Sequence, residues 1–441
     1  MKSKILALFL CTFFATVSAQ ESKKWTMQDC VDYAIQHNIQ IKKSRIKKHI
    51  SHEDVLQSQA DMLPSIMAQT SQNMTYRPWP ETGRATVANG YVQTSVDKVF
   101  YNGSYGVNAN WTIWNGGKNT KTIKQNKINE DMAELDSAIT ANNIQEQIVQ
   151  LFVQIIYTSE AINVNKENLK TCMVNEERGR TMLEVGKMSK ADLAQLTAQR
   201  AEAEYNVVEA ETNVKNYKRQ LKQLLQLTDT EFDVSIPEMT DEMALEEIPT
   251  LKDIYWKASN NRPEIRNVQL GIENSNLSVS LAKAQRMPTV SLNASVITNT
   301  TSMSESGWGT QMKNNLNVGA GVTVSIPILD NRQTKTAINK AMFQKQNYML
   351  DLENELTTLY SNIENYWLQA ESNQKRFKAA RVNTESAQAS FNLLQEQFTL
   401  GLKNIVELMN GKDKLYLAKQ NELQSKYLTI FNIAMLKFYA R

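Results

Sequence analysis

Residues 338–398 read INKAMFQKQNYMLDLENELTTLYSNIENYWLQAESNQKRFKAARVNTESAQASFNLLQEQF. Alternating steps of four and three residues through this stretch pass eighteen positions, and fifteen of them are apolar or aromatic. Such a seven-residue repeat, with no Pro or Gly inside it, predicts a helix supercoiled against partner helices. With a rise of about 1.5 Å per residue, this helix is roughly 90 Å long. The stretch therefore predicts one helix that is far longer than the typical globular helix of about 10–14 residues and that spans a long distance.

The N-terminus has the pattern of a secretory signal. Met1-Lys2-Ser3-Lys4 precedes an apolar run over residues 5–17, and Val17 and Ala19 stand at the −3 and −1 positions of a cleavage site. This pattern predicts a signal peptide over residues 1–19. The run is shorter than the roughly 18–20 residues that a membrane-spanning helix needs, and no second run approaches that length. The exported chain is thus expected either to stay soluble or to enter a membrane as β-strands.

The charge balance of the mature chain is close to neutral. Removing Lys2 and Lys4 leaves 47 basic against 46 acidic residues, a net charge of +1. This balance provides no electrostatic case for a nucleic-acid partner. A basic cluster at residues 42–48 is interpreted as a solvated helix face. Cys30 and Cys172 are the remaining cysteines; a disulfide between them stays open, because two single cysteines form no disulfide framework.

The chain contains an internal duplication. The first repeat, residues 20–250, is predicted to hold a helix over 26–62, a strand hairpin over 65–114, a long helix over 118–185, a return helix over 187–228 and a connector. The second, residues 251–441, repeats this order with a helix over 258–286, a hairpin over 289–328, a long helix over 333–400 and a return helix over 402–441. Pro64 and Pro288 are 224 residues apart, and Gly186 and Gly401 are 215 apart. These constant offsets indicate one duplicated unit.

Two strands in each repeat alternate apolar and polar residues. The first hairpin carries a polar loop over 77–104, and the second carries one over 299–315 before a strand that is expected to run from Leu316 to Ile328. Strands of about ten residues with one apolar face suit an outer-membrane barrel. Four strands cannot close, since such barrels need at least about eight, and an open edge in lipid leaves backbone groups unpaired. Several copies are therefore expected to share one barrel, and three copies supply twelve strands. The alternative is a soluble four-stranded sheet packed on the helices.

The sequence contains few histidines and no motif of an enzyme active site. All three histidines lie in the first predicted helix, and His49, His52 and Glu53 find no further metal ligand. Neither a nucleophile motif nor a phosphate-binding loop occurs. We therefore expect no enzymatic activity, no cofactor and no metal, and a passive function that takes its energy from a partner.

Several motifs in fixed order resemble the TolC-like outer membrane efflux proteins. The resemblance covers essentially the whole mature chain and rests on Leu63-Pro64-Ser65, Trp114-Asn115-Gly116-Gly117, the segment VGKMSKADL at 185–193, and Asn261-Arg262-Pro263-Glu264-Ile265. It implies a mainly helical chain that forms a homotrimer, with a shared twelve-strand outer-membrane β-barrel in contact with lipid and a coiled-coil tunnel in the periplasm. It also implies a periplasmic adaptor (membrane fusion) protein, an inner-membrane pump of RND or ABC type, and export of drugs, toxic compounds or proteins. The alternative reading is a secreted periplasmic coiled-coil structural or adaptor-like protein.

The resemblance implies functional residues at the two inner helical turns. In the family pattern a basic residue after the second-repeat glycine closes the tunnel, so Lys403 is expected to pair with Asp192. Three positions depart from the pattern: Lys403 replaces an arginine, Phe398 replaces a gating tyrosine, and Asn410 replaces a carboxylate beside the constriction residue Glu407. These departures predict a weaker gate and weaker cation selectivity. The other reading of each residue is a solvated helix-end position. The residues expected to contact the adaptor are Gly186, Lys187, Ser189, Gly401 and Leu402.

Overall fold

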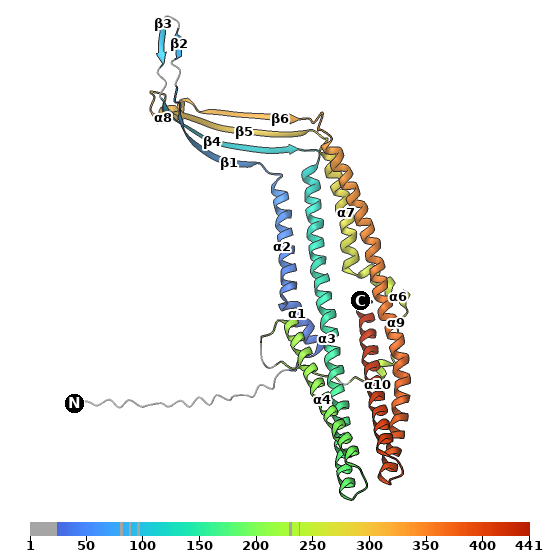
Figure 1. Ribbon diagram of the computed structural model, residues 1–441. Coiled ribbons are helices and arrows are strands. Elements are labelled where there is room, and N and C mark those ends of the chain that lie inside the picture. The colour runs from blue at the N-terminus through green and yellow to red at the C-terminus, as the bar shows by residue number, and fades with distance from the viewer. Residues whose placement is uncertain (1–23, 80–82, 88–89, 95–97, 229–231, 238) are drawn as a thin grey trace, which may run out of the picture. The chain divides into compact units, whose positions relative to one another are not determined.

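The computed structural model describes residues 24–79, 83–87, 90–94, 98–228, 232–237 and 239–441 (Figure 1). The predicted signal peptide lies outside these residues. Within them, helices predominate and four antiparallel strands form the main sheet. This confirms the predicted fold class of long helices with four strands. None of the described helices combines the length and the hydrophobicity needed to cross a membrane.

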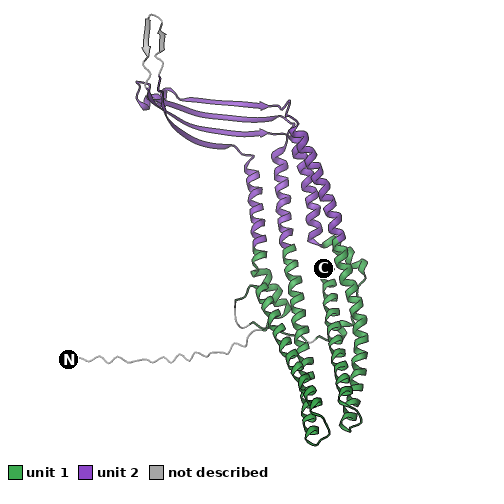
Figure 2. Ribbon diagram, in the orientation of Figure 1, with its two compact units in different colours: residues 1–42, 139–261, 358–441 green, residues 43–138, 262–357 purple. Residues whose placement is uncertain are grey.

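The chain divides into two compact units, and each unit takes segments from both predicted repeats (Figure 2). One unit comprises residues 1–42, 139–261 and 358–441 and is helical in its described part. The other comprises residues 43–138 and 262–357 and contains the main sheet. The two compact units therefore do not coincide with the two predicted repeats, and the repeat boundary between residues 250 and 251 remains a prediction.

Equivalent elements recur in the same order along the chain. The two long helices, α3 (Lys118–Glu184) and α9 (Gln333–Thr399), have 67 residues each. The return helices α4 (Lys190–Leu225) and α10 (Ile405–Tyr439) have 36 and 35. Equal helix lengths in both halves are what a duplicated unit requires.

Each helix that opens a repeat is broken, contrary to expectation. Instead of one helix over 26–62, the structure has α1 (Met27–His37) and α2 (Ile39–Ala60); instead of one over 258–286, it has α6 (Leu251–Asn261) and α7 (Pro263–Ala284). At the first break the buried Asn38 donates from its side-chain amide to the carbonyl of Leu224. At the second, Pro263 starts the new helix, where its missing N–H costs nothing. The residues at the breaks, Asn38 and Arg262, are 224 apart, the offset of Pro64 and Pro288.

The main sheet joins the two repeats in the order β1-β4-β5-β6, with every pairing antiparallel. Its strands are β1 (Ser65–Tyr76), β4 (Val99–Trp114), β5 (Thr289–Thr301) and β6 (Asn317–Ser325). A separate pair, β2 (Gly83–Val87) and β3 (Gly90–Thr94), lies between β1 and β4 in the chain. The central β4–β5 pairing brings together strands from different repeats, which the duplication alone did not predict.

Three expectations for the hairpins are corrected. The loop expected over 77–104 is shorter, because β4 already begins at Val99, and it contains the β2–β3 pair. The loop expected over 299–315 contains the end of β5 and a short helix, α8 (Trp308–Asn314). The last strand ends at Ser325 instead of Ile328. Pro327 explains that end, since proline has no N–H to donate to a strand ladder.

The register separates an apolar face of the sheet from a polar one. On one face Ala68, Val107, Val296 and Val318 lie opposite one another across the four strands. On the other face, one residue along, the row reads Met67, Asn108, Ser295 and Gly319. β1 and β6 are the outer strands of this sheet, and neither has a second partner among the described strands. The sheet therefore presents one apolar surface, one largely polar surface and two open edges.

Candidate functional site at the inner helical turns

The turn between α3 and α4 and the turn between α9 and α10 share one backbone conformation. Gly186 has φ +72° and Gly401 has φ +73°. The N–H of Lys187 donates to the carbonyl of Met182 at 2.8 Å, and the N–H of Leu402 donates to that of Gln397 at 2.9 Å. This is the Schellman motif, which places a glycine in the left-handed region at the end of a helix. Both glycines are therefore explained by backbone geometry.

A capping box starts the helix that follows each turn. The hydroxyl of Ser189 accepts from the N–H of Asp192 at 3.1 Å, and the side-chain oxygen of Asn404 accepts from the N–H of Glu407 at 2.9 Å. In return, each acidic side chain accepts from the backbone N–H of its N-cap residue. The predicted gate residue Asp192 and the predicted constriction residue Glu407 thus occupy equivalent positions, 215 residues apart.

The contacts of Lys403 lie within its own turn. Its ammonium group is 2.9 Å from a carboxylate oxygen of Glu407. This hydrogen bond is the main cause that holds the pKa of Glu407 below its usual value, although partial desolvation opposes it. The carboxylate of Asp192 accepts hydrogen bonds from the N–H and the hydroxyl of Ser189. Within one chain, the structure brings Lys403 to Glu407 and not to Asp192, so an Asp192–Lys403 pair stays a prediction for the assembled protein.

Phe398 lies inside a small core beneath the second turn. Its side chain is 4% exposed. The cluster comprises Leu196, Phe391, Phe398, Ile405, Leu408 and Leu415. Phe398 therefore links α9 and α10 with α4 by apolar packing, and any gating role for it remains a prediction.

Glu407 and Asn410 line a groove between α9 and α10. The groove has a volume of about 590 Å³. Its other lining residues are two leucines, Leu394 and Leu417, and eight small or polar residues: Asn383, Ser386, Ala387, Ser390, Gly411, Lys414, Ala418 and Asn421. The two predicted constriction residues therefore share one polar surface. The exposed tip residues Gly186, Lys187, Gly401 and Leu402 lie at the adjoining helix ends, and Ser189 caps the next helix.

Two charged contacts near the turns were not predicted from the sequence. Apolar residues recur along α4 at steps of three and four, as at Leu196, Ala203 and Val207, and Arg200 interrupts this apolar seam. Its Nε lies 2.8 Å from Glu176, which is buried. Lys412 is 6% exposed and lies 3.4 Å from the sulfur of Cys172 and 3.1 Å from the side-chain oxygen of Gln199. A lone arginine in an apolar seam is a readable signal for a buried partner. Lys412 gave no such signal: it also lies 3.1 Å from the neighbouring Asp413, but Cys172 and Gln199 are remote from it in sequence.

Among the described residues, the cysteines are free and the histidines join no metal-binding cluster. Cys30 and Cys172 are both free and buried, and burial raises the pKa of the Cys30 thiol to about 12. His52 lies 2.9 Å from a carboxylate oxygen of Glu130. Within the described ranges, no three His, Cys, Asp or Glu residues gather as metal ligands.

Comparison with known proteins assigns the fold and the family. The family model described as "Outer membrane efflux protein" matches residues 30–226 and 254–437, one segment in each half of the chain. Outer membrane efflux protein BepC of Brucella suis biovar 1 is 19% identical over 428 residues, which cover 96% of this chain and 87% of that protein. Toxin and drug export protein A of Aggregatibacter actinomycetemcomitans is 21% identical over 299 residues, 67% of this chain and 63% of that protein.

A solved structure of CusC has the same fold, with a TM-score of 0.80 at 13% identity, and the match covers 94% of this chain and 91% of that one. Members of this family are transport channels, and enzymatic activity is not part of their function. The predicted family, function class and outer-membrane location are thereby confirmed. The chain belongs to the outer membrane efflux protein family and is an outer membrane efflux channel of the TolC type.

Proposed function

We propose that three copies of this chain form one outer-membrane channel that serves as the exit duct of a tripartite efflux or type I secretion system. The two open edges of the sheet carry this proposal. A four-stranded sheet in lipid leaves the outward N–H and C=O groups of β1 and β6 unpaired, each at a cost of several kcal/mol. Pairing β6 of one copy with β1 of the next removes both edges, and three copies supply twelve strands.

The two faces of the sheet support this arrangement. The apolar face, with Val107, Val296 and Val318, suits contact with the hydrocarbon of outer-membrane lipid. The polar face, with Asn108 and Ser295, suits a water-filled interior. An inverted arrangement would place polar amides and hydroxyls in lipid without partners. The shared barrel therefore has its apolar side outward.

A cysteine panel tests the closure of the ring. Each variant carries one new cysteine on β1 and one on β6. The variants are oxidised in membranes, and the cross-linked chains are separated by denaturing electrophoresis. Closure predicts that at least one pair yields covalent products that end at three chains. The control pair Thr70→Cys with Tyr105→Cys lies in register within one sheet and should stay at the mass of a single chain. Products that continue beyond three chains, or no intermolecular product from any pair, would contradict the proposal.

The inner helical turns are proposed as the docking site of a periplasmic adaptor protein, which connects the duct to an inner-membrane pump of RND or ABC type. Both turns expose apolar side chains at their ends, with Val185 at 64% and Leu402 at 70% exposure. Solvent-exposed apolar residues at equivalent turns suit contact with a partner. The name of one relative, Toxin and drug export protein A, supports toxins or drugs as cargo. Replacing Leu402 with serine should weaken adaptor co-purification and leave the oligomer intact; unchanged co-purification would argue against this docking site.

Asp192 and Lys403 are proposed to hold the gate between neighbouring helix pairs in the assembled channel. In lipid-bilayer recordings, Asp192→Asn and Lys403→Met should each raise the conductance, and the double variant should not exceed the larger single effect. Lys403→Arg should lower the conductance, because arginine can form two parallel hydrogen bonds to a carboxylate.

Two variants separate the gate from helix capping. Ser189→Ala breaks the capping box without altering charge, so the gate proposal predicts unchanged conductance. Glu407→Gln removes the partner that Lys403 has within one chain. In one contrary outcome, Lys403→Met raises the conductance when combined with Asp192→Asn but leaves it unchanged when combined with Glu407→Gln. That result would mean that Lys403 acts through Glu407, and the proposed gate pair would be wrong.

A further inference from the structure

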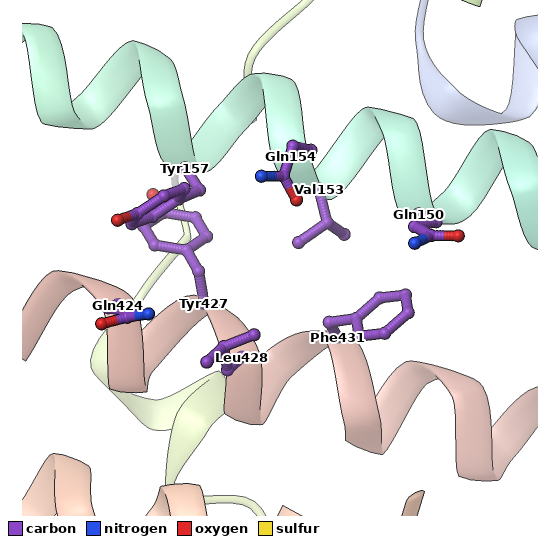
Figure 3. A pocket seen from close by; sticks show the side chains of 8 residues that line it. All are labelled: Gln150, Val153, Gln154, Tyr157, Gln424, Tyr427, Leu428 and Phe431. Atoms are coloured by element: carbon purple, nitrogen blue, oxygen red, sulfur yellow. The ribbon is translucent and has the colours of Figure 1, made fainter. Parts of the chain in front are cut away.

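A concave site lies between α3 and α10, away from the inner turns. Its volume is about 200 Å³ (Figure 3). The lining comes from two helices that are separated by more than 200 residues in sequence, and it comprises Gln150, Val153, Gln154, Tyr157, Gln424, Tyr427, Leu428 and Phe431. All of these residues belong to the same compact unit. We refer to this site as the α3–α10 pocket.

Aromatic rings form much of the pocket wall. Tyr157 and Tyr427 close one end, with their ring centroids 6.2 Å apart, and Phe431 projects from α10 further along (Figure 3). Val153 and Leu428 face each other between these ends (Figure 3). Rings at both ends and aliphatic side chains between them favour a flat apolar ligand, because aromatic pairs gain from offset or edge-to-face contact beyond the area that they bury.

The lining carries no charged side chain. Burial raises the pKa of Tyr157 and of Tyr427, so both phenols stay neutral. Because a charged ligand would lose hydration here and no lining side chain carries an opposite charge, the pocket should select neutral molecules, although Glu160 acts on Tyr427 from outside the lining.

Two amides are available for a polar group on a ligand. Gln154 is engaged with the hydroxyl of Tyr217 at 3.2 Å. The side chains of Gln150 and Gln424, by contrast, make no hydrogen bond to any residue that the structure describes. Both can donate and accept at the rim of the pocket. The ligand that fits best is an aromatic molecule that carries one hydrogen-bonding substituent.

We propose that the α3–α10 pocket binds small, neutral aromatic molecules with a hydrogen-bonding substituent. The volume equals that of about six or seven water molecules in the liquid, which limits the ligand to one or two fused rings. Affinity for so small a molecule is expected near a dissociation constant of about 1 mM. The proposal depends neither on the number of copies in the channel nor on the gate.

Saturation-transfer NMR on the full-length protein, held in solution by an amphipathic polymer, tests the charge selection. Three probes share one ring system: neutral naphthalenemethanol, cationic naphthylmethylammonium and anionic naphthoate. The pocket predicts saturable binding of the neutral probe, at least fivefold tighter than either charged probe. Equal binding of all three probes, or no saturable binding, would overturn the proposal.

Substitutions that fill or strip the pocket test its location. Leu428→Trp fills the space from a side chain that is 39% exposed, so its folding should be preserved, and it should weaken naphthalenemethanol binding at least tenfold. The matched control Leu393→Trp places the same ring on an exposed position of α9 that does not line the pocket, and should leave binding unchanged. Replacing Gln150 and Gln424 together with alanine should weaken binding several-fold. Equal effects of the two tryptophan variants would place the bound probe elsewhere, and would contradict the proposal.

Discussion

Replacing Gly401 with alanine is expected to destabilise the turn between α9 and α10 by about 1 kcal/mol. At φ +73° an L-residue costs roughly 1–2 kcal/mol relative to its preferred conformations. Alanine recovers about 0.4–1 kcal/mol of this by restricting the unfolded chain. No atom lies within 4 Å of a Cβ built at Gly401, so a steric contribution is not expected. The predicted effect is therefore conformational, and Gly186 should behave in the same way, since its φ is +72° and its surroundings are equally open.

Hydrogen exchange measured by mass spectrometry reads this turn directly. The N–H of Leu402 is bonded to the carbonyl of Gln397, and a loss of 1 kcal/mol should speed its exchange about fivefold. Gly401→Asn is the matched variant and should exchange more slowly than Gly401→Ala, because asparagine tolerates the left-handed region.

Gly307→Ala supplies the control at ordinary geometry. Gly307 has φ −59° and equally open surroundings, so alanine carries no left-handed strain there. Its gain of about 0.4–1 kcal/mol from restricting the unfolded chain opposes the weaker N-cap that alanine makes for α8, so exchange in this segment should stay close to that of the parent protein. If Gly401→Ala exchanged like the parent protein, or if Gly307→Ala accelerated its own segment to the same extent, the conformational argument would be refuted.

Two further predictions concern charges near the turns. Arg200→Met should cost about 2 kcal/mol, since it removes the nearer cation from the buried carboxylate of Glu176 and leaves only the Thr197 hydroxyl and the more distant Arg180 as partners. Arg180→Met should cost about 0.5 kcal/mol, because that guanidinium is 57% exposed and lies 3.4 Å from the carboxylate. Thermal unfolding midpoints that fall equally in the two variants would contradict this order. The lowered pKa of Glu407 means that its capping contribution is complete above pH 4.5 and is lost as the pH falls through that lowered pKa. Lys403→Met should move this loss to higher pH in an NMR titration of labelled glutamate carboxyl groups, and an unmoved titration would contradict the assignment.

The regular elements could be predicted because their signals are local. The heptad spacing of residues 338–398 predicted α9, and alternation with the Pro327 stop describes β6. The break at Asn38 could not be predicted, since it depends on the carbonyl of Leu224, which the fold brings from far along the chain. The break at Arg262 was readable, because Pro263 is a helix-start signal that the single-helix expectation overlooked.

The candidate site shows the same division. Ser189 followed three residues later by Asp192 is a capping-box signature, so the local role of Asp192 was readable from the sequence. The contact of Lys412 with Cys172 spans 240 residues and leaves no periodic trace. Pairing between copies, such as the proposed Asp192–Lys403 gate, is set by assembly and lies beyond any single-chain pattern.

Imaging of the detergent-extracted protein by electron microscopy tests the central claim most directly. A shared barrel predicts a three-fold symmetric tube whose detergent belt surrounds twelve strands and leaves the long helices outside the belt. A single chain that stays soluble without detergent, or a ring of another symmetry, would contradict the shared barrel.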